Sequence, residues 1–135
     1  MHKMYMDIIE EFNRRRTEGN ETVLGRDFLP IKRFFALDDR AYEEGKIPAK
    51  YKEMMGLVAS AVLRCNDCIH YHLQQCFEEK CSDDEINEAL NISLVVGGSI
   101  VIPHLRYAFQ VWEKLNRSTD VDPASKGNPR SEKNE

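Results

Sequence analysis

The stretch Cys65-Asn66-Asp67-Cys68-Ile69-His70-Tyr71-His72 places two thiols and two imidazoles within eight residues. In a helix, Cys65, Cys68 and His72 share one face, because residues three, four and seven positions apart lie on one stripe. A histidine four residues after a thiol can serve as the general base that a thiolate nucleophile needs. The stretch therefore predicts a thiol-redox site on a helix.

The predicted helix begins at Asn66 or Asp67, since either side chain can cap the free N–H groups of a first turn. Cys68 then lies in that first turn, where the positive end of the helix dipole favours a thiolate. The Asp67 carboxylate opposes this effect, because it disfavours a second negative charge beside it. The dipole and His72 must together outweigh Asp67 for Cys68 to be reactive at neutral pH.

Glu53 lies twelve residues before the first thiol, on the preceding predicted helix. If the two helices form an antiparallel hairpin, Glu53 faces residues 72–77, and His72 is its nearest titratable neighbour. A carboxylate that accepts a hydrogen bond from one imidazole nitrogen fixes the tautomer and leaves the other nitrogen as a base. The spacing therefore predicts a chain from Glu53 through His72 to a thiol.

Hydrophobic periodicity predicts an all-α fold of about six helices and shows no alternating strand pattern. The predicted helices cover residues 5–17, 29–44, 48–64, 66–80, 82–97 and a last segment that ends near 116. Gly19-Asn20 is expected to end the first helix, Ser82 to Glu85 forms a capping box for the fifth, and Gly97-Gly98 breaks the apolar run that follows. We expect one domain over residues 1–117 and a disordered polar tail over 118–135.

The composition is ordinary for a globular protein, with 31% charged and 41% hydrophobic residues among 135. A net charge of −4 argues against a nucleic-acid surface. The N-terminus has no apolar signal segment, and the most apolar window, 92–102, is too short to span a bilayer. We therefore expect a cytoplasmic protein with no membrane partner, whose thiols are reduced by default.

Two features outside the motif carry further expectations. Cys76 and Cys81 are expected to be small residues in or near the helical core. The window 92–102 is apolar on nearly every face, which is more than a small helical monomer usually buries, so it predicts a homo-oligomer.

The four residues Glu53, Cys65, Cys68 and His72 reproduce the pattern E-x11-C-x2-C-x3-H. In this the chain resembles the alkylhydroperoxidase AhpD-like proteins of the carboxymuconolactone decarboxylase superfamily, over roughly residues 47–115. The resemblance implies an all-helical fold that assembles into homotrimers or homohexamers, needs no cofactor or metal, and acts on a small hydroperoxide.

The resemblance also implies a role for each motif residue. Cys68 would attack the peroxide oxygen and become a sulfenic acid, and Cys65 would resolve it to an intramolecular disulfide. A dithiol reductant, such as a lipoyl- or thioredoxin-like carrier, would reduce that disulfide. His72 and Glu53 would relay protons.

The sequence departs from the pattern at one place. The best-characterised members carry a second histidine just before the second cysteine, where this chain has Asp67. His70 lies two residues past Cys68 but points about 200° around the helix from it. His104 is either bonded locally at a helix end or lines a neighbouring subunit's site. True carboxymuconolactone decarboxylases do not depend on the cysteine pair, so its presence argues against that lyase activity.

Two other functions stay open. Cys65, Cys68 and His72 could bind zinc with His70 or Glu53 as a further ligand, although ligands on a single helix rarely wrap a tetrahedral ion. The protein could also be a redox-sensing or disulfide-exchange oligomer, whose thiols oxidise with little peroxidase turnover.

Overall fold

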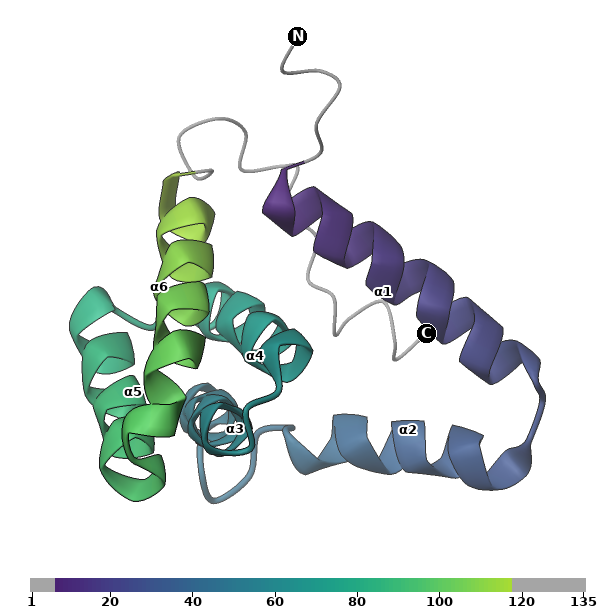
Figure 1. The fold of residues 1–135 in the computed structure, drawn as a ribbon. Helices are drawn as coiled ribbons and strands as arrows, with labels where there is room; N and C mark the ends of the chain where they lie inside the picture. The colour runs from purple at the N-terminus through teal and green to yellow at the C-terminus, as the bar shows by residue number, and fades with distance from the viewer. Residues whose placement is uncertain (1–6, 118–135) are drawn as a thin grey trace, which may run out of the picture. The chain divides into compact units, whose positions relative to one another are not determined.

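The computed structural model describes residues 7–117, which form helices and connecting turns without a strand (Figure 1). The expected all-α class is confirmed. The chain divides into two compact units at the boundary between Ala41 and Tyr42. The single domain expected over 1–117 stays a prediction, and the expected tail, 118–135, lies outside the described residues. No helix within 7–117 has the length and apolar character needed to cross a bilayer.

The first unit holds α1 (Ile8–Gly25) and α2 (Leu29–Ala41). Asp7 caps α1 through its side chain. The prediction that Gly19-Asn20 ends this helix is wrong, because α1 continues to Gly25. A glycine inside a helix costs only about 1 kcal/mol, which the hydrogen bonds of the following turn offset. The second helix ends at Ala41 rather than at residue 44.

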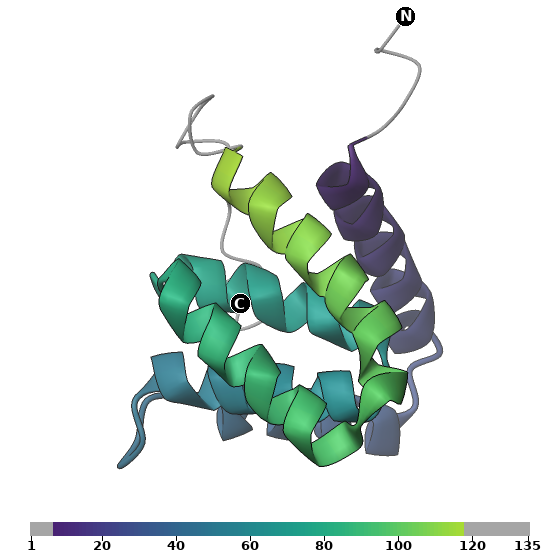
Figure 2. The same ribbon diagram turned by 60° about the vertical axis from the view of Figure 1, so that its left-hand side comes forward.

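The second unit holds α3 (Ala49–Val62), α4 (Asn66–Glu78), α5 (Asp83–Gly97), the short 3-10 helix η2 (Ser99–Val101) and α6 (Ile102–Arg117). The α3 helix packs against α4 and α5, and α4 packs against α6 (Figures 1 and 2). Fully buried aliphatic side chains form the core: Leu57, Ile69, Leu73, Ile86, Leu90 and Val101. Burying each contributes about 1.5 to 3 kcal/mol, so this core fixes α4 against α3.

The predicted start and end of α5 are confirmed. Ser82 Oγ accepts a hydrogen bond from the Glu85 N–H at 3.1 Å, and Glu85 Oε1 accepts one from the Ser82 N–H at 2.8 Å. The chain then breaks at Gly98, whose φ of 80° suits a residue without a side chain. Pro103 lies in the first turn of α6, where its missing N–H costs nothing.

Candidate active site

Cys65 lies at the turn that joins α3 to α4. Arg64 has a φ of 61°, and the Cys65 N–H donates a hydrogen bond to the Ser60 carbonyl at 3.1 Å. The α3 helix therefore ends in a Schellman turn. Cys65 itself is extended, and its Sγ accepts a hydrogen bond from the Cys68 N–H at 3.2 Å. The prediction that Asn66 or Asp67 caps α4 is therefore wrong, because the sulfur of Cys65 takes the free N–H.

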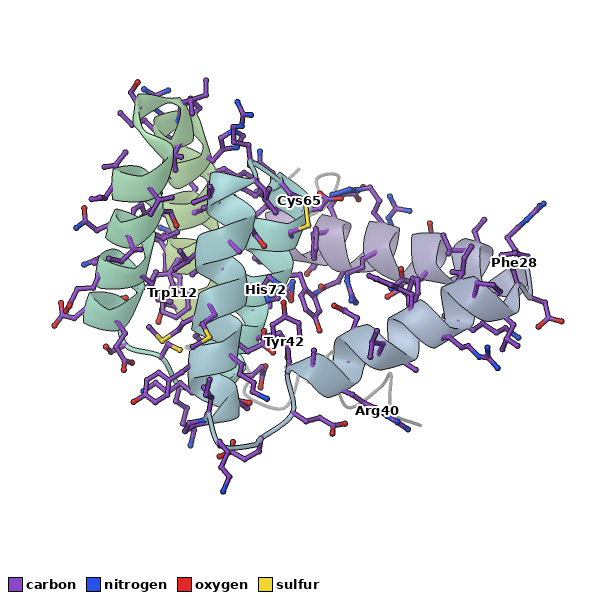
Figure 3. All side chains as sticks on the ribbon, turned by 90° about the horizontal axis from the view of Figure 1, so that it is seen from below. Phe28, Arg40, Tyr42, Cys65, His72 and Trp112 are labelled. Carbon is purple, nitrogen blue, oxygen red and sulfur yellow. A yellow bond between two sulfur atoms is a disulfide. The ribbon has the colours of Figure 1, made fainter. Side chains whose placement is uncertain are left out.

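The two motif cysteines are joined by a disulfide, with their Cα atoms 5.3 Å apart (Figure 3). Cys68 is exposed, and Cys65 is half-buried. In the reduced state the Cys68 sulfur would lie in the first turn of α4, where the positive end of the helix dipole stabilises a thiolate.

Glu53 and His72 meet between α3 and α4, as the hairpin spacing predicts. Glu53 Oε1 lies 2.9 Å from His72 Nδ1. Glu53 is completely buried, and His72 is 8% exposed. The bond to Nδ1 fits the tautomer that carries its proton there, which leaves Nε2 as the basic nitrogen.

Tyr42 is a residue that sequence reasoning missed. Its hydroxyl lies 3.5 Å from His72 Nε2, and the two rings have centroids 5.1 Å apart (Figure 3). Tyr71 meets the same imidazole edge-on at 5.3 Å. The predicted helix 29–44 included Tyr42, but α2 ends at Ala41, so Tyr42 stands in the connection before α3. Helical periodicity therefore gave no correct direction for this side chain.

The accessory candidates do not gather at the thiols. His70 is fully buried, and its Nδ1 lies 2.8 Å from the hydroxyl of Tyr107 on α6. His104 Nδ1 lies 2.8 Å from Asn66 Oδ1, which ties α6 to the first turn of α4. Asp67 is an exposed acid in that turn.

The described residues offer no cluster for a metal ion. Across 7–117, three or more His, Cys, Asp or Glu side chains are nowhere arranged to hold one. His72 Nδ1 bonds to Glu53, and its Nε2 faces the Tyr42 hydroxyl. The arrangement is therefore that of a dithiol–disulfide pair beside a buried carboxylate–imidazole pair.

Comparison with known proteins places the chain in a family. Residues 31–114 match the model of the carboxymuconolactone decarboxylase family. An uncharacterized protein of Cupriavidus necator is 25% identical over 76 residues, which are 56% of this chain and 67% of that protein.

Solved structures show the same fold. A crystal structure of a Thermotoga maritima protein is 56% identical, covers 84% of this chain and 99% of its own, and has a TM-score of 0.82. A second structure from Thermotoga maritima, at 55% identity over 82% of this chain and 93% of its own and a TM-score of 0.79, is described as a family member for which a part in the antioxidative response has been suggested. A family protein of Legionella pneumophila, at 19% identity, covers 82% of this chain and 98% of its own with a TM-score of 0.75, which bears on the fold alone. By the family match and these structural relatives, the chain belongs to the carboxymuconolactone decarboxylase family.

Proposed function

We propose that this protein is a thiol-dependent peroxidase of the AhpD-like type, which reduces a small hydroperoxide with its Cys65–Cys68 dithiol. The observation that carries the proposal is the disulfide at the start of α4, with Cys68 exposed, on the helix that also holds the buried His72–Glu53 pair. The antioxidative role suggested for the Thermotoga maritima relative supports the same class of chemistry.

The reaction follows ordinary thiol chemistry. The Cys68 thiolate attacks a peroxide oxygen, the O–O bond breaks, an alcohol or water leaves, and a sulfenic acid forms. The Cys65 thiol then attacks the Cys68 sulfur, releases water and closes the disulfide. A lipoyl- or thioredoxin-like dithiol carrier reduces the disulfide by thiol–disulfide exchange. The cytoplasmic location that we propose would supply such carriers.

His72 and Glu53 act as the proton relay in this proposal. With Nδ1 bonded to Glu53, Nε2 is the nitrogen that takes the proton from the reacting thiol and returns it to the leaving oxygen. The Tyr42 hydroxyl, which faces Nε2, holds the ring in its orientation.

Cysteine variants test the proposal directly. We expect Cys68→Ser to lose most of the peroxide turnover seen with a lipoyl- or thioredoxin-like carrier as donor, because it removes the thiol that attacks the peroxide in this proposal. We expect Cys65→Ser to keep a sulfenic acid on Cys68 when peroxide is added without a reductant, because that residue then has no resolving thiol. Dimedone labelling followed by mass spectrometry locates that sulfenic acid. Full turnover by Cys68→Ser would contradict the proposal.

A redox-sensing or disulfide-exchange role is the second candidate, and Asp67 is the observation that favours it. This exposed carboxylate stands where the best-characterised relatives have a histidine, and it opposes a second negative charge nearby. A clean Cys65–Cys68 disulfide after peroxide treatment, without turnover by any dithiol donor, would favour this role. Asp67→His is then the first substitution to test for a gain of turnover.

A homo-oligomer, as a homotrimer or homohexamer, is part of the proposal. In the second unit, Val101 of the window 92–102 is buried, but most other apolar side chains of the window stay exposed, with Val95 at 73% and Val96 at 67%. Beside them, α3 and α5 line an apolar groove of about 780 Å³. A second copy of the chain would bury this surface.

A charge placed on this surface should weaken the assembly. We expect Val96→Asp to lower the mass measured by size-exclusion chromatography with light scattering, because the interface would have to bury an unpaired carboxylate. Asn87→Asp, on an exposed position of the same helix, is the matched control and should leave the mass unchanged. A monomeric wild-type protein at micromolar concentration would contradict the proposed assembly.

A further inference from the structure

A second pair of thiols lies at the other end of α4. Cys76 is in the last turn of the helix, and Cys81 follows in the connection to α5. Both are buried, as the sequence predicts, with Cys76 at 0% and Cys81 at 8% exposure. On an uninterrupted helix, residues five positions apart would point about 140° away from each other.

The chain turn after α4 brings these two cysteines together. Lys80 has a φ of 63°, and its N–H bonds to the Phe77 carbonyl at 3.1 Å. The Cys81 N–H bonds to the Cys76 carbonyl at 3.0 Å. These two bonds define a Schellman motif, in which the side chains at the positions of Cys76 and Cys81 typically touch. The contact that apolar side chains usually make in this motif is made here by two thiols.

The two thiols are electrostatically unequal. The hydrogen bond from Cys76 lowers the pKa of Cys81, and the positive charge of Lys50 lowers it further, while burial and the charges of Glu85 and Glu79 oppose them. The same hydrogen bond, followed by burial and by the charges of Cys81, Glu53 and Glu79, raises the pKa of Cys76. Of the two thiols, Cys81 is therefore the one whose thiolate is favoured.

We propose that Cys76 and Cys81 are a second redox-active dithiol, which a small hydroperoxide oxidises to an intramolecular disulfide. The Cys81 thiolate attacks a peroxide oxygen, the O–O bond breaks, the alkoxide or hydroxide takes up a proton, and a sulfenic acid remains on Cys81. The Cys76 sulfur attacks the Cys81 sulfur, and the hydroxyl leaves with the Cys76 proton as water. In sum, one hydroperoxide and two thiols give an alcohol or water, one further water and one disulfide.

This pair works independently of Cys65 and Cys68. Cys76 lies eight positions after Cys68 on α4, which is about 12 Å along the axis. Thiol–disulfide exchange needs direct contact between sulfurs, so the two pairs cannot exchange within one chain. Oxidation of Cys76 and Cys81 therefore records exposure to peroxide even where the first pair is missing.

The double variant Cys65→Ser with Cys68→Ser isolates the second pair. The folded, reduced double variant is treated with hydrogen peroxide, alkylated in denaturant and digested with trypsin without reduction. Trypsin cleaves after Lys80, between the two cysteines, so their disulfide joins peptide 65–80 to peptide 81–106. We expect this linked pair, its loss of two hydrogens in the intact mass, and its separation by dithiothreitol.

Single substitutions in the same double variant test the order of attack. With Cys76→Ala, dimedone should label a sulfenic acid on Cys81, and with Cys81→Ala it should not label Cys76, which solvent does not reach. Circular dichroism checks that each variant is folded. Recovery of Cys76 and Cys81 as free thiols after peroxide treatment overturns the proposal, and labelling of Cys76 alone overturns the assigned order. Because Cys65 and Cys68 are absent throughout, peroxidase turnover by the first pair has no influence on either result.

Discussion

Glu53→Ala should lower the free energy of unfolding by about 2 to 4 kcal/mol and the peroxidase turnover by about 100-fold or more. The carboxylate is fully buried and bonds to His72 Nδ1 at 2.9 Å. Alanine leaves a cavity between α3 and α4 and a buried imidazole nitrogen without its acceptor. The same imidazole also loses the bond that fixes its tautomer, so both readouts should fall together.

Glu53→Gln separates the two effects. The amide fills the same space, and its oxygen can accept the same hydrogen bond, so we expect a stability loss of only about 1 kcal/mol. Turnover should still fall, because a neutral amide does not stabilise the imidazolium that forms when His72 takes a proton. Urea unfolding followed by fluorescence of the single Trp112 measures the first quantity, and peroxide consumption measures the second.

Glu88→Ala is the matched control for both variants. Glu88 is an exposed glutamate on α5, and substitutions at such positions usually change stability by no more than about 0.5 kcal/mol. If Glu53→Ala unfolded at the same urea concentration as Glu88→Ala, the Glu53–His72 bond would contribute nothing to the fold.

The sequence was sufficient to predict the Glu53–His72 contact, because that contact follows from local spacing. Helix periodicity places Glu53 on one helix and His72 on the next, and a short turn near Cys65 leaves little choice in their register. The helix start at Ser82 was equally predictable, because a capping box is a local pattern of side-chain and backbone hydrogen bonds.

Other features depend on backbone conformations that have no local signature. Arg64 and Lys80 adopt positive φ without being glycine, and the turns that they form place Cys65 at a helix cap and bring Cys81 to Cys76. Asparagine or glycine would have signalled such turns. Tyr42 reaches His72 from an irregular connection, where periodicity says nothing about direction. The glycine in α1 failed to end its helix because neighbouring turns overrode its weak propensity.

Gly56→Ala should displace the His72 ring, because the added methyl group would collide with the imidazole. A Cβ at position 56 would lie 2.6 Å from His72 Cε1, 2.8 Å from Nε2 and 2.9 Å from Nδ1, all closer than non-bonded atoms approach. The ring has little freedom to give way, because Glu53 bonds its Nδ1 and Tyr42 faces its Nε2. Only glycine therefore allows α3 and the imidazole to approach this closely.

We expect Gly56→Ala to destabilise the protein by about 1 to 3 kcal/mol, despite the better helix propensity of alanine. Turnover should fall by about 100-fold, since a base displaced by about 1 Å no longer meets its proton. Gly19→Ala is the matched control: it lies within α1, nothing stands within 4 Å of its new Cβ, and it should stabilise the protein by about 0.5 to 1 kcal/mol. The two substitutions should therefore shift the urea midpoint of unfolding in opposite directions. A Gly56→Ala protein that gained stability like Gly19→Ala and kept its turnover would show that His72 does not pack on Gly56 in the working protein.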